Sequence, residues 1–382
     1  MKRPVQHTAG VVAEWLRDER RVVAGTLVAV DGSAPLDVGA SVYVEEGGTL
    51  EGSVTGGCVE GAVAEAALQI LERGGGGAGP RLETYGISNE LAGTVGLMCG
   101  GTVHIFIHEL AGDAREATLC GLEAILAERP AALATLLDGP LAGAKMYVDA
   151  ESRVGSLGGP RLLDANVERE ARGLVVQGQS TVRSYGEDGA TLGTGLRVHV
   201  AAFAESPRMV IFGAIDFAAA LAPMARGLGY RVTIADPRRA FLASPRFSAS
   251  AEVVPGWPDA VLSEGELGPR DAVLVFTHDP KLDVPAVVTA LASGAGYIGA
   301  LGSRKTTLDR NERLRAEGVD EDDITRVFAP CGLDVGASTV EETAIAILAE
   351  MIGHRAGREG GSLRSASGPI RRERDEASRL VP

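Results

Sequence analysis

The amino-terminal half of the chain alternates short apolar stretches with glycine-rich turns. Helical spacing of apolar residues predicts helices at 10–20, 59–71 and 113–129. Apolar alternation and short apolar runs predict strands at 22–30, 41–46 and 102–110. Strands and helices therefore follow one another at short intervals, which is typical of an α/β region.

Residues 131–203 resemble a diverged copy of residues 24–107. The segment GASVYV matches GAKMYV, LEGSVTGG matches RVGSLGG, and GTVHIFI matches GLRVHVAA, which pairs His104 with His199. A single repeat after about 100 residues indicates a duplicated domain rather than a solenoid. We therefore interpret residues kept in both copies as structural, and residues found in one copy as candidates for chemistry. On this basis the first copy is the working half and the second a scaffold.

After Pro207 the pattern changes to apolar strands that alternate with helices. The run RMVIFGAIDFAAALAPMARGLGYRVTIADPR reads as strand, glycine turn, helix and strand, and further strand–helix pairs follow it. This alternation predicts a Rossmann-like, doubly wound parallel sheet. The expected domains are 1–110, its decayed repeat 111–205, the Rossmann-like domain 207–356 and a disordered tail at 357–382.

Composition narrows the function classes. The 382 residues carry a formal net charge of −14, which argues against a nucleic-acid partner because such proteins present a basic face. No apolar run has the length of a membrane span, and the first residues lack the apolar core of a signal peptide. The four cysteines form no CxxC pair, which favours a reducing cytoplasm over a disulfide framework.

One cysteine follows two glycines where a helix is expected to begin. In Gly56-Gly57-Cys58 the free amides and the dipole of that helix would favour the thiolate of Cys58, and the glycines would let a ligand approach the backbone. The site would then hold an anion or a soft metal. The alternative is a tight turn with a small buried cysteine. Because the second copy has Pro160 in place of Cys58, we favour the functional interpretation.

A second cysteine also lies beside paired glycines. In Cys99-Gly100-Gly101 the cysteine is absent from the second copy, where its position falls near Gly193-Thr194. Cys58 and Cys99 either converge on one site, or Cys99 occupies an ordinary β-turn. Cys120 falls within the predicted Ala/Leu-rich helix and is assigned to the core.

The turn at Gly213 departs from a dinucleotide-binding fingerprint. Ile215 replaces the second glycine of G-x-G-x-x-G, and Asp216 adds negative charge where phosphates would lie. Asp236 follows the next strand, where a ribose-binding acid is expected. The fold signal is therefore intact, and ordinary NAD(P) binding is disfavoured.

Polar residues follow the later strands of the predicted parallel sheet, at the edge where ligands bind in such folds. His278 beside Asp279 suits a proton shuttle, and these two are the candidate catalytic residues. Ser303 and Arg304 suit a phosphate. The alternative role of all four is loop capping and surface charge.

The order of these motifs resembles the XdhC/CoxI family, the accessory proteins of xanthine dehydrogenase and carbon monoxide dehydrogenase. The resemblance covers about residues 10–355 and rests on GSAP, GSVTGGCVE, GLMCGG, THDPKLD, GYIGALGSRKT and PCGLDVGASTVEETAIAILAEM. It implies a molybdenum cofactor chaperone that supports sulfuration of the cofactor and its insertion into an apo-hydroxylase. It further implies a cysteine desulfurase-type sulfur donor as partner, with Cys58 or Cys99 as a molybdenum or sulfur ligand.

The sequence departs from the family pattern in several places, and two of them bear on ligand contacts. GSAPLDVG lacks a basic residue, and GAIDFA stands where family members read GAGHVA. We expect a non-enzymatic maturation factor and leave a homodimer open. One alternative is an NAD(P)-dependent oxidoreductase that uses His278 as proton shuttle and Asp236 on the ribose. Another is an interaction scaffold without a ligand.

Overall fold

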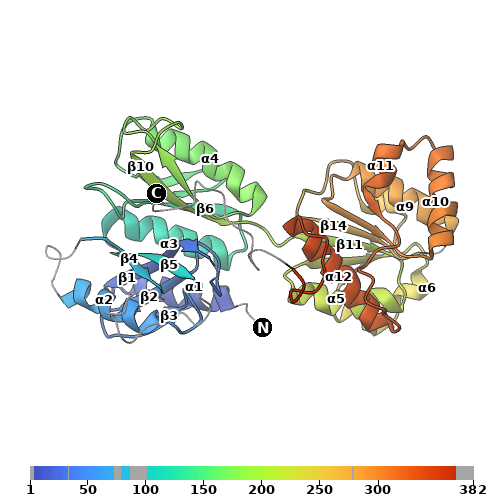
Figure 1. The fold of residues 1–382 in the computed structure, drawn as a ribbon, viewed down its shortest axis with the longest axis horizontal. Coiled ribbons are helices and arrows are strands. Elements are labelled where there is room, and N and C mark those ends of the chain that lie inside the picture. The colour runs from blue at the N-terminus through green and yellow to red at the C-terminus, as the bar shows by residue number, and fades with distance from the viewer. Residues whose placement is uncertain (1–3, 33, 73–78, 87–100, 278, 367–382) are drawn as a thin grey trace. The chain divides into compact units, whose positions relative to one another are not determined.

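The computed structural model describes residues 4–32, 34–72, 79–86, 101–277 and 279–366. The chain divides after Glu205 into two compact units, both visible in Figure 1. Within the described residues, the first unit holds two five-stranded sheets and the second holds one six-stranded sheet.

The first sheet of unit 1 is antiparallel, with the strand order β3-β2-β1-β5-β4. Helix α2 covers one face of it, where Val63 and Ile70 pack against Val23 and Ile105. The elements are α1 (Pro4–Arg17), β1 (Val22–Asp31), β2 (Ser41–Glu45), β3 (Leu50–Gly52), α2 (Glu60–Glu72), β4 (Arg81–Tyr85), β5 (Thr102–Glu109) and α3 (Gly112–Leu126).

The second sheet repeats this arrangement, with the order β8-β7-β6-β10-β9 and antiparallel neighbours. Helix α4 covers it as α2 covers the first sheet, with Val167 and Leu174 against Met146 and Val200. The elements are β6 (Ala131–Leu136), β7 (Lys145–Val148), β8 (Arg153–Gly155), α4 (Leu163–Gln177), β9 (Thr181–Tyr185) and β10 (Leu196–Phe203). The predicted duplicated α/β region is thereby confirmed.

Helices α1 and α3 pack between the inner faces of the two sheets. Val12 and Leu16 of α1 share a buried cluster with Leu122 of α3. On its other side α3 packs against the second sheet, where Ala117 meets Leu133. Each fully buried side chain of the size of valine or leucine contributes about 1.5–3 kcal/mol. The two copies are therefore joined by a core of their own.

The strand registers correct one pairing between the copies. Thr26 lies opposite Ser41 and Phe106, whereas Thr135 lies opposite Lys145 and His199. Since GASVYV and GAKMYV already match Ser41 with Lys145, His199 occupies the place of Phe106. The prediction that His199 matches His104 is wrong by two residues. The place of His104 belongs to Arg197, because His104 lies opposite Thr84 and Arg197 lies opposite Ser184, the first residues of the TYG and SYG segments.

Unit 2 is a parallel sheet in the order β13-β12-β11-β14-β15-β16. This is the doubly wound Rossmann order, so the predicted fold class is confirmed. The strands are β11 (Arg208–Phe212), β12 (Arg231–Ala235), β13 (Glu252–Val254), β14 (Ala272–Val275), β15 (Tyr297–Ala300) and β16 (Val327–Phe328). The helices are α5 (Asp216–Gly227), α6 (Arg239–Leu242), α7 (Pro245–Ser248), α8 (Pro258–Val261), α9 (Pro280–Ala292), α10 (Arg304–Ala316), α11 (Glu321–Thr325) and α12 (Val340–Ala356).

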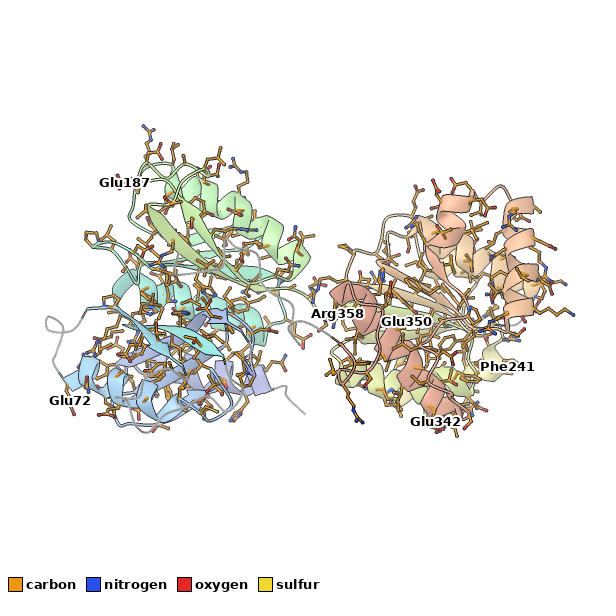
Figure 2. The ribbon with its side chains drawn as sticks, viewed as in Figure 1. Glu72, Glu187, Phe241, Glu342, Glu350 and Arg358 are labelled. Carbon is orange, nitrogen blue, oxygen red and sulfur yellow. The ribbon has the colours of Figure 1, made fainter. Side chains whose placement is uncertain are left out.

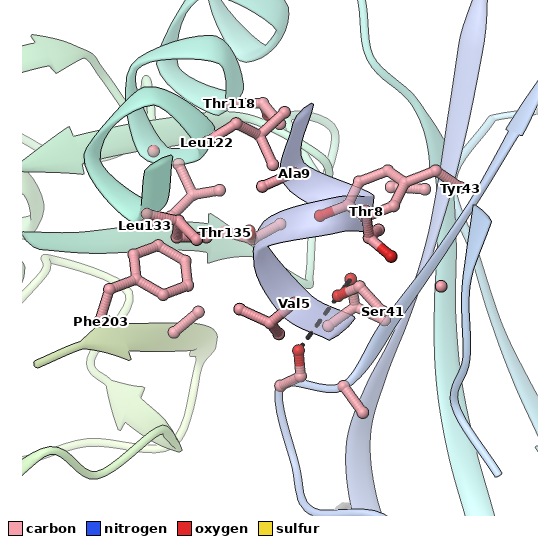
Figure 3. A pocket seen from close by; sticks show the side chains of 18 of the residues that line it. Val5, Thr8, Ala9, Ser41, Tyr43, Thr118, Leu122, Leu133, Thr135 and Phe203 are labelled. Atoms are coloured by element: carbon pink, nitrogen blue, oxygen red, sulfur yellow. Dashed lines mark hydrogen bonds between the residues drawn. The ribbon is translucent and has the colours of Figure 1, made fainter. Parts of the chain in front are cut away.

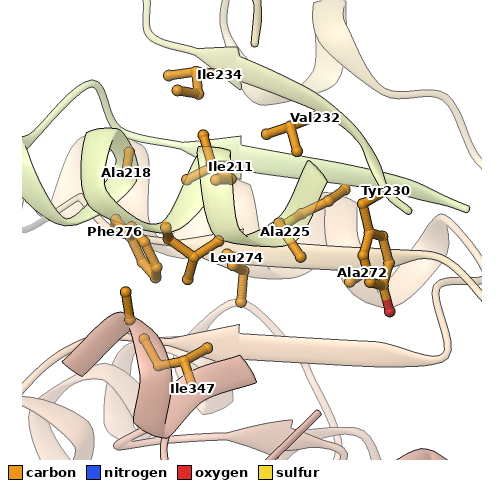
Figure 4. Packing of buried hydrophobic residues seen from close by; sticks show 14 of the residues in the cluster. Ile211, Ala218, Ala225, Tyr230, Val232, Ile234, Ala272, Leu274, Phe276 and Ile347 are labelled. Atoms are coloured by element: carbon orange, nitrogen blue, oxygen red, sulfur yellow. The ribbon is translucent and has the colours of Figure 1, made fainter. Parts of the chain in front are cut away.

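Alternate residues of the central strand face opposite sides of this sheet. Ile211 points toward α5 and α12, where it joins Leu221 and Ile347 (Figure 4). Phe212 faces the other side and joins Val287 of α9 and Leu314 of α10. Helices thus cover both faces, as burial of an all-parallel sheet requires.

The last helix starts with a capping box, in which the Thr339 hydroxyl accepts from the Glu342 amide and the Glu342 carboxylate accepts from the Thr339 amide. Glu342 is labelled at this end of the helix in Figure 2. It ends before Gly357, whose φ is 64°. Residues 367–382 lie outside the described part of the chain, so the disordered tail stays a prediction. No helix of the described part combines the length and apolar character needed to cross a membrane.

Candidate functional site

The glycine–cysteine loop at 53–59 wraps around the carboxylate of Glu60, the first residue of α2. Five backbone amides donate to its two oxygens at 2.8–3.2 Å, and two hydroxyls add further hydrogen bonds at 2.6 and 2.9 Å. The amides are those of Val54, Thr55, Gly56, Gly57 and Val59, and the hydroxyls are those of Ser53 and Thr55. Gly56 and Gly57 have φ of 79° and 118°, which suits glycine.

This arrangement changes the expected role of the loop. Burial raises the pKa of Glu60, but the hydrogen bonds from Ser53, Thr55 and Val54 outweigh it and lower that pKa to about 2. The amides that the sequence suggested for a ligand anion therefore already serve a carboxylate of the chain. In the second copy Asp164 accepts from the Leu157 amide at 3.0 Å. Because both copies keep this contact, we assign Glu60 a structural role.

Cys58 remains available for chemistry. Its thiol is free and partly exposed, and its side chain packs against the core beneath α2. A Cβ placed on Gly56 or on Gly57 would meet no atom within 4 Å, so the backbone beside the thiol is open to a ligand. Gly101 is buried just before β5. Cys99 and Gly100 lie outside the described residues, and convergence of the two cysteines stays a prediction.

His104 belongs to a polar contact that both copies keep. Its Nε2 lies 2.9 Å from Asp31 Oδ2, and its Nδ1 lies 2.9 Å from Thr84 Oγ1. In the second copy Arg197 donates from Nε to Asp138 at 2.8 Å. In both copies a basic residue, on β5 or β10, therefore contacts an acidic residue at or just beyond the end of β1 or β6, which indicates a structural role for His104.

In unit 2, the turn at Gly213 is fixed by close packing. Gly213 has φ of 117°, and a Cβ there would lie 2.9 Å from the backbone nitrogen of Thr277. Only glycine fits such a position without a shift of the neighbouring strand end. Asp216 opens α5 and pairs with Arg246.

Asp236 is engaged by its own surroundings. Its oxygens accept from the amide and guanidinium of Arg238 at 2.8–2.9 Å and from the Ala214 amide at 3.1 Å. Burial raises the pKa of Asp236, while the hydrogen bonds from Arg238 and Ala214 lower it below its ordinary value overall. A ribose would have to displace Arg238 from this carboxylate.

The other predicted residues of unit 2 begin helices. Asp279 accepts from the Lys281 amide at 3.0 Å, and Ser303 accepts from the Thr306 amide at 3.1 Å, so both are N-caps. Arg304 is exposed in the first turn of α10. His278 lies outside the described residues.

The sheet order brings these turns to one edge. Gly213, Asp236, Asp279 and Ser303 follow β11, β12, β14 and β15, whose carboxyl ends share that edge. The order reverses between β11 and β14, which is where ligands bind in open α/β sheets.

A buried ion pair behind this edge escaped sequence analysis. Arg310 Nε lies 2.9 Å from Asp283 Oδ2, and Arg310 Nη2 donates to the Leu301 carbonyl at 2.6 Å. Both side chains are almost fully buried. The helical spacing of Thr307, Arg310 and Leu314 places all three on the buried face of α10. This spacing is the sequence signal that identifies Arg310 as buried. Within the described residues, no group of histidine, cysteine and acidic side chains is arranged to hold a metal ion.

Comparison with family models identifies the chain. The model of the XdhC and CoxI family matches residues 15–86 and 124–186, one segment in each copy of unit 1. The model of the XdhC Rossmann domain matches residues 209–351, which is most of unit 2. The chain belongs to the XdhC and CoxI family.

Individual relatives agree with this assignment. A Bacillus subtilis protein, named as a probable subunit of xanthine dehydrogenase, is 25% identical over 88% of this chain and 94% of its own length. The Escherichia coli molybdenum cofactor insertion chaperone PaoD is 26% identical over 91% of this chain and 88% of its own length. A crystal structure described as a xanthine dehydrogenase from Bacillus halodurans shares the fold, with a TM-score of 0.64, 23% identity, and coverage of 94% of this chain and 98% of that one.

Proposed function

We propose that this protein binds the molybdenum cofactor and inserts it into a molybdenum hydroxylase of the xanthine dehydrogenase type. Membership of the XdhC and CoxI family supports this role. Further support comes from two relatives matched over most of their length, one named for xanthine dehydrogenase and the other for insertion of the molybdenum cofactor.

The observation that carries the proposal is the partly exposed thiol of Cys58 beside open glycine backbone. Thiolate is a soft ligand that suits the sulfur-rich metal centre of the cargo. The loop amides already donate to Glu60, so we assign the phosphate of the cargo to other groups of the chain.

We further propose that Cys58 and Cys99 hold the cofactor while a cysteine desulfurase-type donor installs its terminal sulfur. The protein would then act in the reducing cytoplasm as a non-enzymatic factor, alone or as a homodimer. Its partners would be the sulfur donor and the apo-hydroxylase.

The test compares two cysteine variants. Wild type, Cys58→Ala and Cys120→Ala are purified from cells that make the molybdenum cofactor, and bound pterin is oxidised to its fluorescent form and quantified. Cys120 is the matched control because it is also a free, partly exposed thiol. We expect pterin with wild type and Cys120→Ala and a loss with Cys58→Ala. Equal pterin in both variants would reject the role of Cys58, and absence of pterin from wild type would reject cofactor binding.

A further inference from the structure

A cavity of about 600 Å³ lies within unit 1, between its two sheets. Val5 and Thr8 of α1, Ser41 and Tyr43 of β2, and Thr135 of β6 surround it in Figure 3. Most of the remaining wall is apolar and includes Leu36, Leu110, Leu122, Ile125, Leu133 and Phe203. A cavity of this size and lining is typical of a site for a small organic molecule.

The second copy places two basic side chains in this wall. Lys145 is 4% exposed, and its Nζ donates to Thr135 Oγ1 at 2.7 Å. His199 is 2% exposed, and its Nε2 has no hydrogen-bond partner. From the first copy, the hydroxyls of Thr26 and Ser41 face the same cavity, 3.1 Å from each other.

Nothing in the described part of the chain neutralises Lys145. Its ammonium forms no salt bridge with any described carboxylate, and burial lowers the pKa of Lys145 to about 7. Burial and the charge of Lys145 lower the pKa of His199 to about 3. A buried amine without a counter-ion is costly to a fold. A buried titratable group of this kind that lines a cavity is typical of a ligand site.

The duplication shows that the fold does not require these groups. Ser41 occupies the place of Lys145 in the first copy, and Phe106 occupies the place of His199. Thr26 and Ser41 contact each other as Thr135 and Lys145 do, so the same pair of strand positions is neutral in one copy and basic in the other. The basic pair therefore occurs in the second copy and not at the matching positions of the first.

We propose that this cavity binds a small organic anion whose phosphate or carboxylate group meets Lys145, Thr135 and His199, and whose flat apolar body lies against Leu133 and Phe203. The proposal goes beyond the cofactor-delivery function, because its residues lie on β6, β7 and β10 and do not include Cys58.

The test uses 2-naphthyl phosphate, a flat and fluorescent phosphate ester, with 2-naphthol as the uncharged probe. A charged hydrogen bond in such a site strengthens binding roughly tenfold to hundredfold. We therefore expect wild type to bind the ester at least tenfold more tightly than 2-naphthol. Lys145→Met should lose this preference, and Lys281→Met, which removes an exposed lysine from unit 2, should keep it.

Stability provides a second readout that separates a ligand site from a structural lysine. Lys145→Met removes a buried charge, so it should unfold at a higher denaturant concentration than wild type. Lys145→Ser introduces the first-copy residue and should also lose the preference for the ester. If both variants bind the ester as tightly as wild type, or if wild type binds it no more tightly than 2-naphthol, the proposal is overturned.

Discussion

Replacement of Glu60 by glutamine tests whether this carboxylate holds the glycine–cysteine loop. Glutamine keeps the length of the side chain, but its NH₂ group replaces a carboxylate oxygen that accepts hydrogen bonds in wild type. Oε2 accepts from the Gly57 amide, the Val59 amide and the Thr55 hydroxyl. In the variant, either these three donors or the donors at Oε1 would lose their acceptor, because the NH₂ group takes the place of one of the two oxygens.

The magnitude follows from the pKa of Glu60. A fall from 4.5 to about 2 corresponds to about 3 kcal/mol of stability at neutral pH. Partial exposure of the Glu60 side chain reduces this to about 2 kcal/mol. The contribution is fully present above pH 4.5 and is lost as the pH falls through 2, because the depressed pKa belongs to the folded state.

The assay is urea unfolding of unit 1, followed by the fluorescence of Trp15. The chain has two tryptophans, and Trp15 is buried in unit 1 while Trp257 is half exposed in unit 2. A Trp257→Phe background therefore leaves a probe of unit 1 alone. Asp164→Asn is the matched control, since Asp164 accepts one described hydrogen bond, from Leu157.

We expect Glu60→Gln to lower the free energy of unfolding by about 2 kcal/mol and Asp164→Asn by about 1 kcal/mol. The gap between wild type and Glu60→Gln should narrow below pH 4.5. A loss from Glu60→Gln no larger than that from Asp164→Asn, or a gap independent of pH, would refute the role assigned to this carboxylate.

Three further predictions concern single residues. Asp283→Ala should destabilise unit 2 by about 3–5 kcal/mol in denaturant unfolding because Arg310 would stay buried without its partner; a loss below 1 kcal/mol would contradict this. Gly213→Ala should cost unit 2 about 2 kcal/mol by the same assay, owing to its positive φ and the contact with the next strand end. Iodoacetamide should modify Cys58 before Cys331, as followed by peptide mass spectrometry, because burial raises the pKa of the Cys331 thiol to about 12. Equal rates of modification would contradict the greater exposure of Cys58.

Much of the fold was predictable because buried apolar residues recur at one spacing in strands and at another in helices. The residue-by-residue match between the two copies was not predictable. A shift of two residues keeps every side chain of a strand on the same face, so the apolar pattern alone cannot distinguish His104 from Phe106 as the counterpart of His199. Only the backbone pairing across β10 decides between them.

The site was less predictable because its chemistry depends on tertiary contacts. The position of Glu60 predicts a stabiliser of the first helical turn, but glycines with positive φ fold the preceding loop back onto its carboxylate. Lys145 occurs in an alternating strand, where a lysine is typical of a solvent face. It is buried because α3 and the first copy cover that face of the second sheet.

Transfer of the cofactor tests the central claim most directly. The protein purified with its cofactor is mixed with an apo form of a xanthine dehydrogenase-type hydroxylase, and pterin content and hydroxylase activity are followed together. The account predicts that pterin moves to the hydroxylase as its activity rises, and that Cys58→Ala supports neither change. Pterin that stays on the protein, or a hydroxylase that gains equal activity without it, would contradict the account.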